Sequence, residues 1–390
     1  MKYKLGQICL TNAESYSKSD NWNYVNYLDT GNITENKIDE IQFIELNNEK
    51  LPSRAKRKVI VGDIIYSTVR PNQLHYGYIS YIPDNFLVST GFTTIRVDQA
   101  IANSKYIYFL LTQDEVTQHL SALAEQSTSA YPSIKPSDIE NLEIDLPPLE
   151  TQKQIASILS ALDDKIELNN KINENLEQQA QAIFKSWFVD FEPFGGVMPD
   201  DWRMGTLSEI CDYSKDKVDI DDLTLDTYYS TENMQPNRQG AVQATTLPTI
   251  KQTTACKKGD VLISNIRPYF KKILYCFSDC GCSTDVLCFV PNKTDYSAFL
   301  YCALYADKFF DYMVTGSKGT KMPRGDKQQI MVYPICIPSA EYIEKFNQAV
   351  APMLETVYTN RIEANNLANL RDTLLPKLMN GEIDVSAVEI

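Results

Sequence analysis

The feature that most constrains the fold of this 390-residue chain is an internal repeat. The string GDIIYSTVRP at residues 62–71 recurs as GDVLISNIRP at residues 259–268. Three shorter matches occur in the same order in both halves of the chain: residues 3–6 with 202–205, 30–33 with 231–234, and 89–90 with 283–284. Matches that keep their order while their spacing changes slightly indicate two copies of one unit with loops of different length. The chain is therefore expected to build one fold twice.

Each copy divides into a mixed body and a helical tail. The β-rich runs at residues 59–69 and 261–266 lie just before a proline and predict strands. Residues 106–112 and 298–310 predict short helices or buried segments, which periodicity alone cannot distinguish. Polar residues lie between these segments. We therefore expect each body to be a domain that mixes helices and strands.

The two tails carry a clearer pattern, in which seam residues alternate by four and three positions. This spacing is that of the heptad seam of a coiled coil. The predicted seam residues are Ile155, Leu159, Leu162, Ile166, Asn169 and Leu176 in the first tail, and Val350, Met353, Val357, Asn360, Leu367 and Leu374 in the second. Asn169 and Asn360 occupy matching seam positions, where an asparagine costs stability but fixes the register of the pairing.

Two matching seams on one chain predict that the helices pack on each other in antiparallel orientation. The alternative is two separate amphipathic helices, each packed on its own body. The predicted fold class is α+β, with two pseudo-repeated α/β domains separated by two long antiparallel coiled-coil helices. We expect the first body at residues 1–148, the first helix at 149–192, the second body at 193–338, and the second helix with a C-terminal tail at 339–390.

Charge and hydropathy narrow the function. The net charge of −14 argues against non-specific affinity for nucleic acid. Two basic islands, residues 50–75 and 251–327, are compatible with a DNA-binding face, which needs local rather than total positive charge. No apolar run approaches the roughly 18 residues of a membrane span. The polar N-terminal sequence lacks the hydrophobic stretch of a signal peptide, so the expected compartment is the cytoplasm.

The sequence carries no recognisable catalytic or metal-binding motif. Its two histidines, His75 and His119, have no counterparts in the other copy. Neither a phosphate-binding P-loop nor a dinucleotide-type glycine motif is present. Four cysteines crowd between residues 276 and 288, but without the paired C-x-x-C spacing of a zinc ribbon. We expect no catalytic residue, no metal site and no cofactor bound by this chain.

Several short strings, taken in order on a repeat, point to a known family. They are LPPLETQKQI at residues 146–155, INENLE at 172–177, AIFKSWFVDF at 182–191 and LLPKLMNGEI at 374–383. With these strings the whole chain resembles the specificity (S) subunits of type I restriction-modification systems. The second copy departs from the pattern at residues 339–342, where the usual entry into the helix is blurred.

The resemblance implies a division of labour between subunits. Each body would be a target recognition domain that reads one half of a bipartite double-stranded DNA sequence. The paired helices would act as a spacer and as the docking surface for two modification subunits. Those subunits would bind S-adenosylmethionine and methylate adenine at N6, and separate restriction subunits would supply ATP- and Mg²⁺-dependent cleavage. The chain itself would have no catalytic activity and no membrane partner.

Candidate DNA contacts lie in loops that follow the repeated strands. Arginine and lysine pair with guanine, and asparagine and glutamine with adenine, whereas phosphate contacts carry no sequence information. The first set of candidates is Arg70, Asn72 and Gln73 in one copy, and Arg267, Tyr269 and Lys271 in the other. Because the two arginines match, they are expected to position the backbone, and the residues that differ are the specificity candidates.

A second set of candidates lies in two polar loops that precede a proline in each copy. These are Ser127, Ser129 and Tyr131 before Pro132, and Lys318, Thr320 and Lys321 before Pro323. Three other functions stay open at this point. The chain could be an interaction protein that does not bind nucleic acid, or a self-contained enzyme such as a divergent methyltransferase. Within the family it could be a silent or switching specificity cassette.

Overall fold

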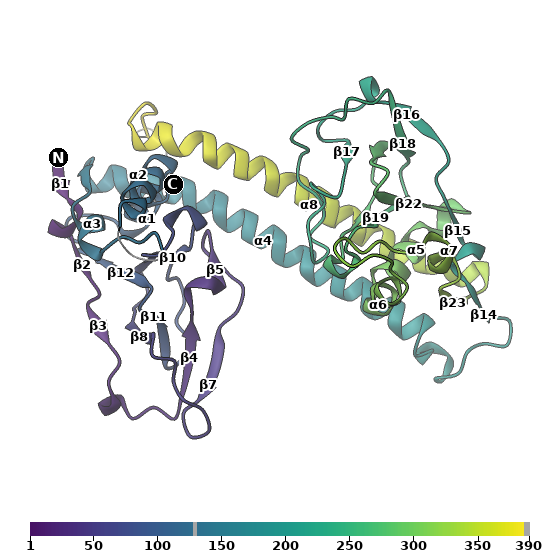
Figure 1. Cartoon of the computed structure of the whole chain (residues 1–390), viewed down its shortest axis with the longest axis horizontal. Helices are drawn as coiled ribbons and strands as arrows, with labels where there is room; N and C mark the ends of the chain where they lie inside the picture. The colour runs from purple at the N-terminus through teal and green to yellow at the C-terminus, as the bar shows by residue number, and fades with distance from the viewer. Residues whose placement is uncertain (128–130, 386–390) are drawn as a thin grey trace. The chain divides into compact units, whose positions relative to one another are not determined.

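The computed structural model describes residues 1–127 and 131–385 and divides into two compact units. The first unit comprises Met1–Ile166 and Asn365–Ile390, and the second comprises Glu167–Ala364. Two long helices, α4 (Leu149–Phe188) and α8 (Ala340–Met379), each contribute one stretch to each unit. Each unit therefore contains one body and parts of both helices (Figure 1).

The body of the first unit holds two main sheets. One is antiparallel with strand order β10-β9-β12-β2, and the other is mixed with order β3-β8-β11-β4-β7. The strands of these sheets are β2 (Cys9–Thr11), β3 (Glu14–Ser15), β4 (Tyr24–Leu28), β7 (Gln42–Glu45), β8 (Ala55–Lys58), β9 (Ile64–Ser67), β10 (Tyr76–Tyr78), β11 (Phe86–Ser89) and β12 (Phe92–Val97).

Smaller elements complete this body. Strand β1 (Lys2–Lys4) pairs with β13 (Glu143–Asp145), and β5 (Ile33–Thr34) pairs with β6 (Lys37–Ile38). The short helices are α1 (Ser104–Leu111), α2 (Asp114–Glu125) and α3 (Pro136–Glu140). The segment predicted as a helix or buried run is thus helix α1, and nearly all of its side chains are buried.

The body of the second unit repeats this plan. The order β20-β19-β22-β15 matches β10-β9-β12-β2, and β16-β18-β21-β17 matches β3-β8-β11-β4. The elements are β14 (Arg203–Thr206), β15 (Cys211–Tyr213), β16 (Lys217–Asp219), β17 (Tyr228–Tyr229), β18 (Gln252–Cys256), β19 (Val261–Ser264), β20 (Ile273–Tyr275), β21 (Cys280–Cys282), β22 (Val286–Pro291), β23 (Pro334–Ile337), α5 (Ser297–Tyr305), α6 (Asp307–Thr315) and α7 (Lys327–Met331). The predicted tandem repeat of mixed bodies is confirmed.

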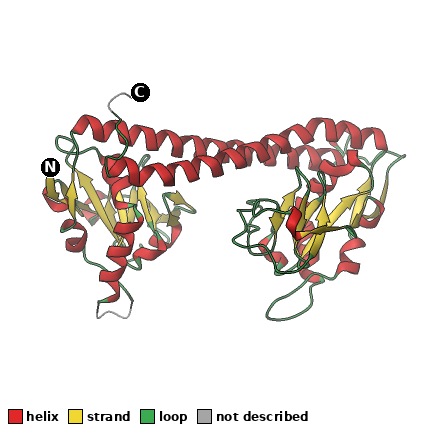
Figure 2. Ribbon diagram, turned by 90° about the horizontal axis from the view of Figure 1, so that it is seen from above, coloured by secondary structure: helices red, strands yellow, loops and turns green. Residues whose placement is uncertain are grey.

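Both long helices join the hydrophobic core of each unit, on one side of the strands (Figure 2). Ile155 of α4 and Leu378 of α8 are buried in the core of the first unit. Phe184 of α4 and Phe346 of α8 are buried in the core of the second, with ring centroids 6.0 Å apart. A helix that packed only on its own body would not contribute to both cores, so this arrangement disfavours the separate-helix alternative.

The predicted seam residues face the interior of the units. Five of them are buried and the others are half-buried: Ile155, Leu159, Asn169, Val350 and Val357 in the first group, and Leu162, Ile166, Leu176, Met353, Asn360, Leu367 and Leu374 in the second. In the second unit the Asn169 amide donates to Glu363 Oε2 at 2.8 Å, and the Asn360 amide donates to Asn173 Oδ1 at 2.9 Å. Residue numbers that rise on α4 and fall on α8 show that the helices run antiparallel there.

Candidate nucleic-acid interface

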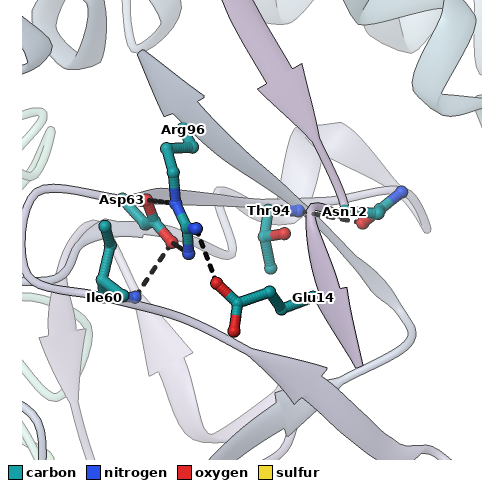
Figure 3. A network of polar contacts seen from close by, with 6 residues as sticks. All are labelled: Asn12, Glu14, Ile60, Asp63, Thr94 and Arg96. Carbon is teal, nitrogen blue, oxygen red and sulfur yellow. Dashed lines mark hydrogen bonds and ion pairs between the residues drawn. The ribbon is translucent and has the colours of Figure 1, made fainter. Parts of the chain in front are cut away.

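The repeated Gly-Asp pair anchors the start of the central strand in each body. In the first unit Asp63 is buried and accepts a hydrogen bond from the backbone of Ile60 at 2.9 Å. Its two oxygens also accept from Nε and Nη2 of Arg96, both at 3.0 Å, and Arg96 pairs with Glu14 at 2.8 Å (Figure 3). The Arg96 guanidinium holds the pKa of the Glu14 carboxyl below its usual range. The network ties β12 to the loop before β9.

The second unit keeps the anchor but lacks its cation. Asp260 accepts from the backbone of Lys257 at 2.7 Å and from the Cys288 thiol at 3.4 Å. Strand register pairs Ile64 with Ile95 and Val261 with Phe289, so Val290 stands where the first unit has Arg96. Burial raises the pKa of Asp260.

The end of each central strand has an unusual backbone. Arg70 and Arg267 both adopt left-handed conformations, with φ of 48° and 50°. A short 3-10 turn follows each arginine, and Leu74 and Lys271 then return to left-handed φ values of 57° and 51°. Such values cost energy for residues other than glycine, and they persist only where the surrounding structure enforces them. The same geometry in both units indicates a shared purpose for these loops.

The two predicted sets of DNA-contact residues come together in the first unit. The Arg70 amide donates to the Pro132 carbonyl at 3.0 Å, and Val69 bridges Ser133. The Arg70 guanidinium lies 5.3 Å from the centroid of the exposed Tyr131 ring. A cavity of about 100 Å³ opens beside them, lined by Arg70, Pro71, Asn72, Ser121, Ala124, Glu125 and Pro132.

The other candidates of this unit surround the same loop. Asn72 and Gln73 are exposed, as a base-contacting residue has to be. Ser127 is half-buried, and its hydroxyl accepts from the backbone of Ser133 at 3.3 Å. Ser129 lies outside the described residues.

The second unit brings the corresponding loops together. The Arg267 amide donates to the Pro323 carbonyl at 2.8 Å, and Ile266 bridges Arg324. Tyr269 is 48% exposed, and its ring lies 4.8 Å from that of Phe270. This exposed aromatic pair, at the tip of the 3-10 turn, offers a flat apolar surface to a ligand.

The other five candidates of the second unit differ in how accessible their side chains are. Lys271 is only half-buried, but its ammonium group lies 2.6 Å from Asp307, so part of its charge is neutralised. Lys318 is paired with Asp326. Thr320 and Lys321 are exposed. Arg267 itself is half-buried, and its Nε makes no hydrogen bond within the described part of the chain.

A further segment beside each loop escaped sequence reasoning. The Glu35 amide donates to the Leu74 carbonyl at 2.9 Å, and the Arg238 amide donates to the Lys271 carbonyl at 3.0 Å. Both donors belong to two-residue left-handed turns, Glu35–Asn36 and Asn237–Arg238. No sequence match marks these turns as equivalent, and only the Asn-Arg-Gln composition of the second could have drawn attention to it.

Ion pairs neutralise part of the two basic islands. In the first island Lys58 of β8 pairs with Asp20, whereas Lys56 of β8 and Arg54 just before this strand are exposed. In the second island Lys258 pairs with Glu355 and Arg324 with Asp285. The islands therefore supply a modest local positive charge rather than a continuous basic face.

Five of the nine cysteines form a buried cluster in the second unit. Cys276 and Cys280 have their sulfurs 3.6 Å apart, and Cys256, Cys282 and Cys288 are buried nearby. Over residues 1–127 and 131–385 no three histidine, cysteine or acidic side chains are arranged to hold a metal ion. None of the described helices is long and apolar enough to cross a membrane.

Comparison with known proteins decides the family. A family model described as the type I restriction modification DNA specificity domain matches residues 1–178 and again residues 199–371. The chain belongs to this family. Each match covers one body and much of the long helix that follows it, so the two copies seen in the fold are two copies of the specificity domain. The resemblance drawn from the sequence is confirmed.

Several specificity subunits are similar over most of their length. The type I restriction enzyme HindI specificity subunit of Haemophilus influenzae is 26% identical, over 98% of this chain and 99% of that protein. The MjaIX specificity subunit of Methanocaldococcus jannaschii is 26% identical, over 79% of this chain and 76% of that protein. The solved S subunit of a type I restriction-modification system from M. genitalium shares the fold, with a TM-score of 0.61 at 17% identity over 97% and 95% of the two chains.

Proposed function

We propose that this chain is the DNA-reading subunit of a type I restriction-modification complex. Each body would read one half of a bipartite double-stranded target. The observation that carries the proposal is the loop built twice with the same left-handed residues, at Arg70 with Leu74 and at Arg267 with Lys271. The side chains on the two loops differ, so the two half-sites should differ in sequence.

The arginines and the residues around them would divide the work of recognition. Arg70 and Arg267 occupy the same place in both units, which suits contacts to the phosphate backbone. Asn72 and Gln73 in one loop, and Tyr269 with Lys271 in the other, would contact bases or their stacked faces. Tyr131 would support Arg70, whose guanidinium lies over its ring.

The two long helices would form an antiparallel coiled-coil spacer and dock two modification subunits. Between the helices the Asn360 side chain donates to Asn173 Oδ1 and the Asn169 side chain to the Asn360 carbonyl, and these bonds would fix the register of the helices. S-adenosylmethionine would bind the modification subunits, and ATP with Mg²⁺ the restriction subunits. This chain would contribute specificity without catalysis to adenine-N6 methylation and DNA cleavage. The cytoplasm is the compartment in which such a complex meets DNA.

Binding of DNA by the chain in its complex tests this function. The full chain would be co-purified with the modification subunit of its own system and mixed with duplexes carrying the adenine-methylated motif of its host. We expect tight binding that requires both halves of the motif, with affinity falling steeply as salt increases. Scrambling either half, at unchanged length and composition, serves as the matched control.

Two results would contradict the proposal. A folded complex without preference for any motif would indicate an interaction protein or a silent cassette. Binding of S-adenosylmethionine by the chain alone would indicate a self-contained methyltransferase instead.

A further inference from the structure

The left-handed turn of the second unit presents two amide side chains beside the DNA-contact loop. The backbone N–H of Asn237 donates to the Phe270 carbonyl at 2.8 Å, and the backbone N–H of the next residue donates to the Lys271 carbonyl. These two bonds hold the turn against the tip of that loop. Asn237 and Gln239 are exposed. Their side-chain amides make no hydrogen bond within the residues that the structure describes.

Arg238, between them, points the other way and is anchored to helices α5 and α6. Its Nε donates to the Tyr305 carbonyl at 2.9 Å, and its guanidinium lies 4.7 Å from the Tyr305 ring. It also pairs with Asp307 at 2.5 Å, the carboxylate that binds Lys271. Hydrogen bonds from Arg238 and Lys271, together with their charges, lower the pKa of Asp307 to about 2, so this carboxylate stays ionised near neutral pH.

The long helices hold the turn from a second side. Arg361 of α8 donates to the Arg238 carbonyl at 3.2 Å and pairs with Glu177 of α4 at 2.8 Å. Gly240 follows with φ of +80°, and a side chain there would meet the Arg361 guanidinium at 3.2 Å. Contacts to α5, α6 and α8 thus fix the turn, and its two exposed side chains, Asn237 and Gln239, stay unpaired within the described part of the chain. Such fixed geometry is what base reading requires.

We infer that the turn Asn237–Gln239 is a further base-contacting element of the second body, and that Arg238 is its positioning residue. The inference rests on the proposed function. The chemistry favours adenine, because a carboxamide can donate to N7 and accept from N6 of that base in the major groove. The turn and the Tyr269–Phe270 tip would then read neighbouring positions of one half-site.

The first body lacks this element, although its backbone makes the corresponding turn. There the Asn36 side chain is already used, because its oxygen accepts from the backbone of Tyr78 at 2.7 Å. Its neighbour is Glu35, whose negative charge would repel phosphate. The inferred contact therefore belongs to one half-site alone, which gives the test an internal reference.

The test uses the full chain in complex with its modification subunit. The probe is a set of duplexes built on the host's methylated motif, in which each base of both half-sites is randomised in turn. The variants are Asn237→Gly, which suits a left-handed backbone, and Gln239→Ala. Asn292→Ala is the control for loss of an exposed asparagine away from the loop, since Asn292 lies at the opposite end of β22, where its side chain donates to the Glu209 carbonyl at 3.0 Å.

We expect each turn variant to lose roughly 5- to 150-fold of its preference for one base in one half-site, with the other half-site unchanged. Arg238→Ala should reduce the base preference at the same half-site positions. Arg238→Lys should keep part of that preference, because lysine keeps the positive charge opposite Asp307. The inference is overturned if the wild-type complex selects a bipartite motif and both turn variants select it equally well. A wild-type complex that selects no motif overturns the proposed function, and the inference with it.

Discussion

Arg371 of α8 donates from Nη1 to the Asp163 carboxylate of α4 at 2.8 Å, which joins the two long helices beside the first body. Burial raises the pKa of Asp163, and the Arg371 charge opposes that shift. The pair is about a third exposed, so solvent screens its attraction. Its main effect is to give a partner charge to a carboxylate that burial has partly removed from water.

Replacing this arginine should destabilise the first unit in a pH-dependent way. Arg371→Ala should cost about 1 kcal/mol at neutral pH, because Asp163 keeps its charge without its partner. The change also raises the pKa of Asp163 further. A carboxyl with a raised folded-state pKa gains stability as the pH falls through that value, so the loss should shrink in mild acid. Urea unfolding of the wild type and the variant at several pH values measures this loss of stability. The double variant Arg371→Ala, Asp163→Asn should show little pH dependence, and an equal loss at every pH would contradict this account.

The two anchoring aspartates should respond differently to the same substitution. Asp63→Asn breaks the two-pronged contact with Arg96 and should cost about 2 kcal/mol. Asp260→Asn should cost less than about 1 kcal/mol, because an amide can still accept from Lys257 and this carboxyl has no arginine beside it.

The Asp260 variant also carries a pH signature. Since the folded-state pKa of Asp260 is raised, the wild type loses stability as the pH rises through that value. The free energy of unfolding that Asp260→Asn loses relative to the wild type should therefore be smaller at higher pH. Amide hydrogen exchange, measured in β9 and in β19, assigns each loss of stability to its unit. Equal losses at both sites would show that Arg96 contributes nothing.

Two glycines with left-handed backbones separate strain from contact. Gly195 has φ of +72° with open space around its missing side chain, so Gly195→Ala should cost about 1 kcal/mol from backbone strain alone. Gly240→Ala should cost more, because the new methyl group also displaces Arg361. Thermal unfolding compares the two variants, and selection of DNA by the complex should weaken for Gly240→Ala only. Similar losses of stability would mean that Arg361 moves aside freely.

Salt dependence distinguishes phosphate contacts from base contacts. If Arg70 and Arg267 neutralise phosphates, each alanine variant should weaken binding to all sequences and reduce the slope of log affinity against log salt by about 1. Asn72→Ala or Gln73→Ala should keep the slope and change the preference within one half-site by about 1–3 kcal/mol. Titration of the complex at several salt concentrations measures both. An arginine variant that changes base preference with an unchanged slope would reverse the assignment.

Local patterns carried much of the fold. The repeated string at residues 62–71 and 259–268 placed the two central strands, and the heptad spacing placed residues that are all at least half-buried in α4 and α8. The repeat also pointed to the loops at Arg70 and Arg267, because a strand that ends at Arg-Pro twice must turn there twice. These are properties of residues close together in the chain, where periodicity and turn chemistry act directly.

Other features depended on contacts between distant residues. Arg96 and Val290 occupy equivalent positions in β12 and β22, yet only the arginine gives the buried aspartate of its unit a cation. Lys271 looked like a free DNA contact in the sequence, but Asp307 lies beside it in the fold. The turn at Asn237 has no repeat signal, since its place beside Phe270 comes from backbone hydrogen bonds rather than side chains.

The sequence by itself therefore determined the duplication, the central strands, the apolar seam and the family. Only the tertiary structure decided which charges are compensated, which amides remain exposed, and that α4 and α8 each enter the cores of both units. The physical reason is the separation along the chain over which each kind of interaction acts. Backbone preference and hydrophobic period act over a few residues, whereas ion pairing and burial depend on neighbours that folding brings together from more than a hundred residues away.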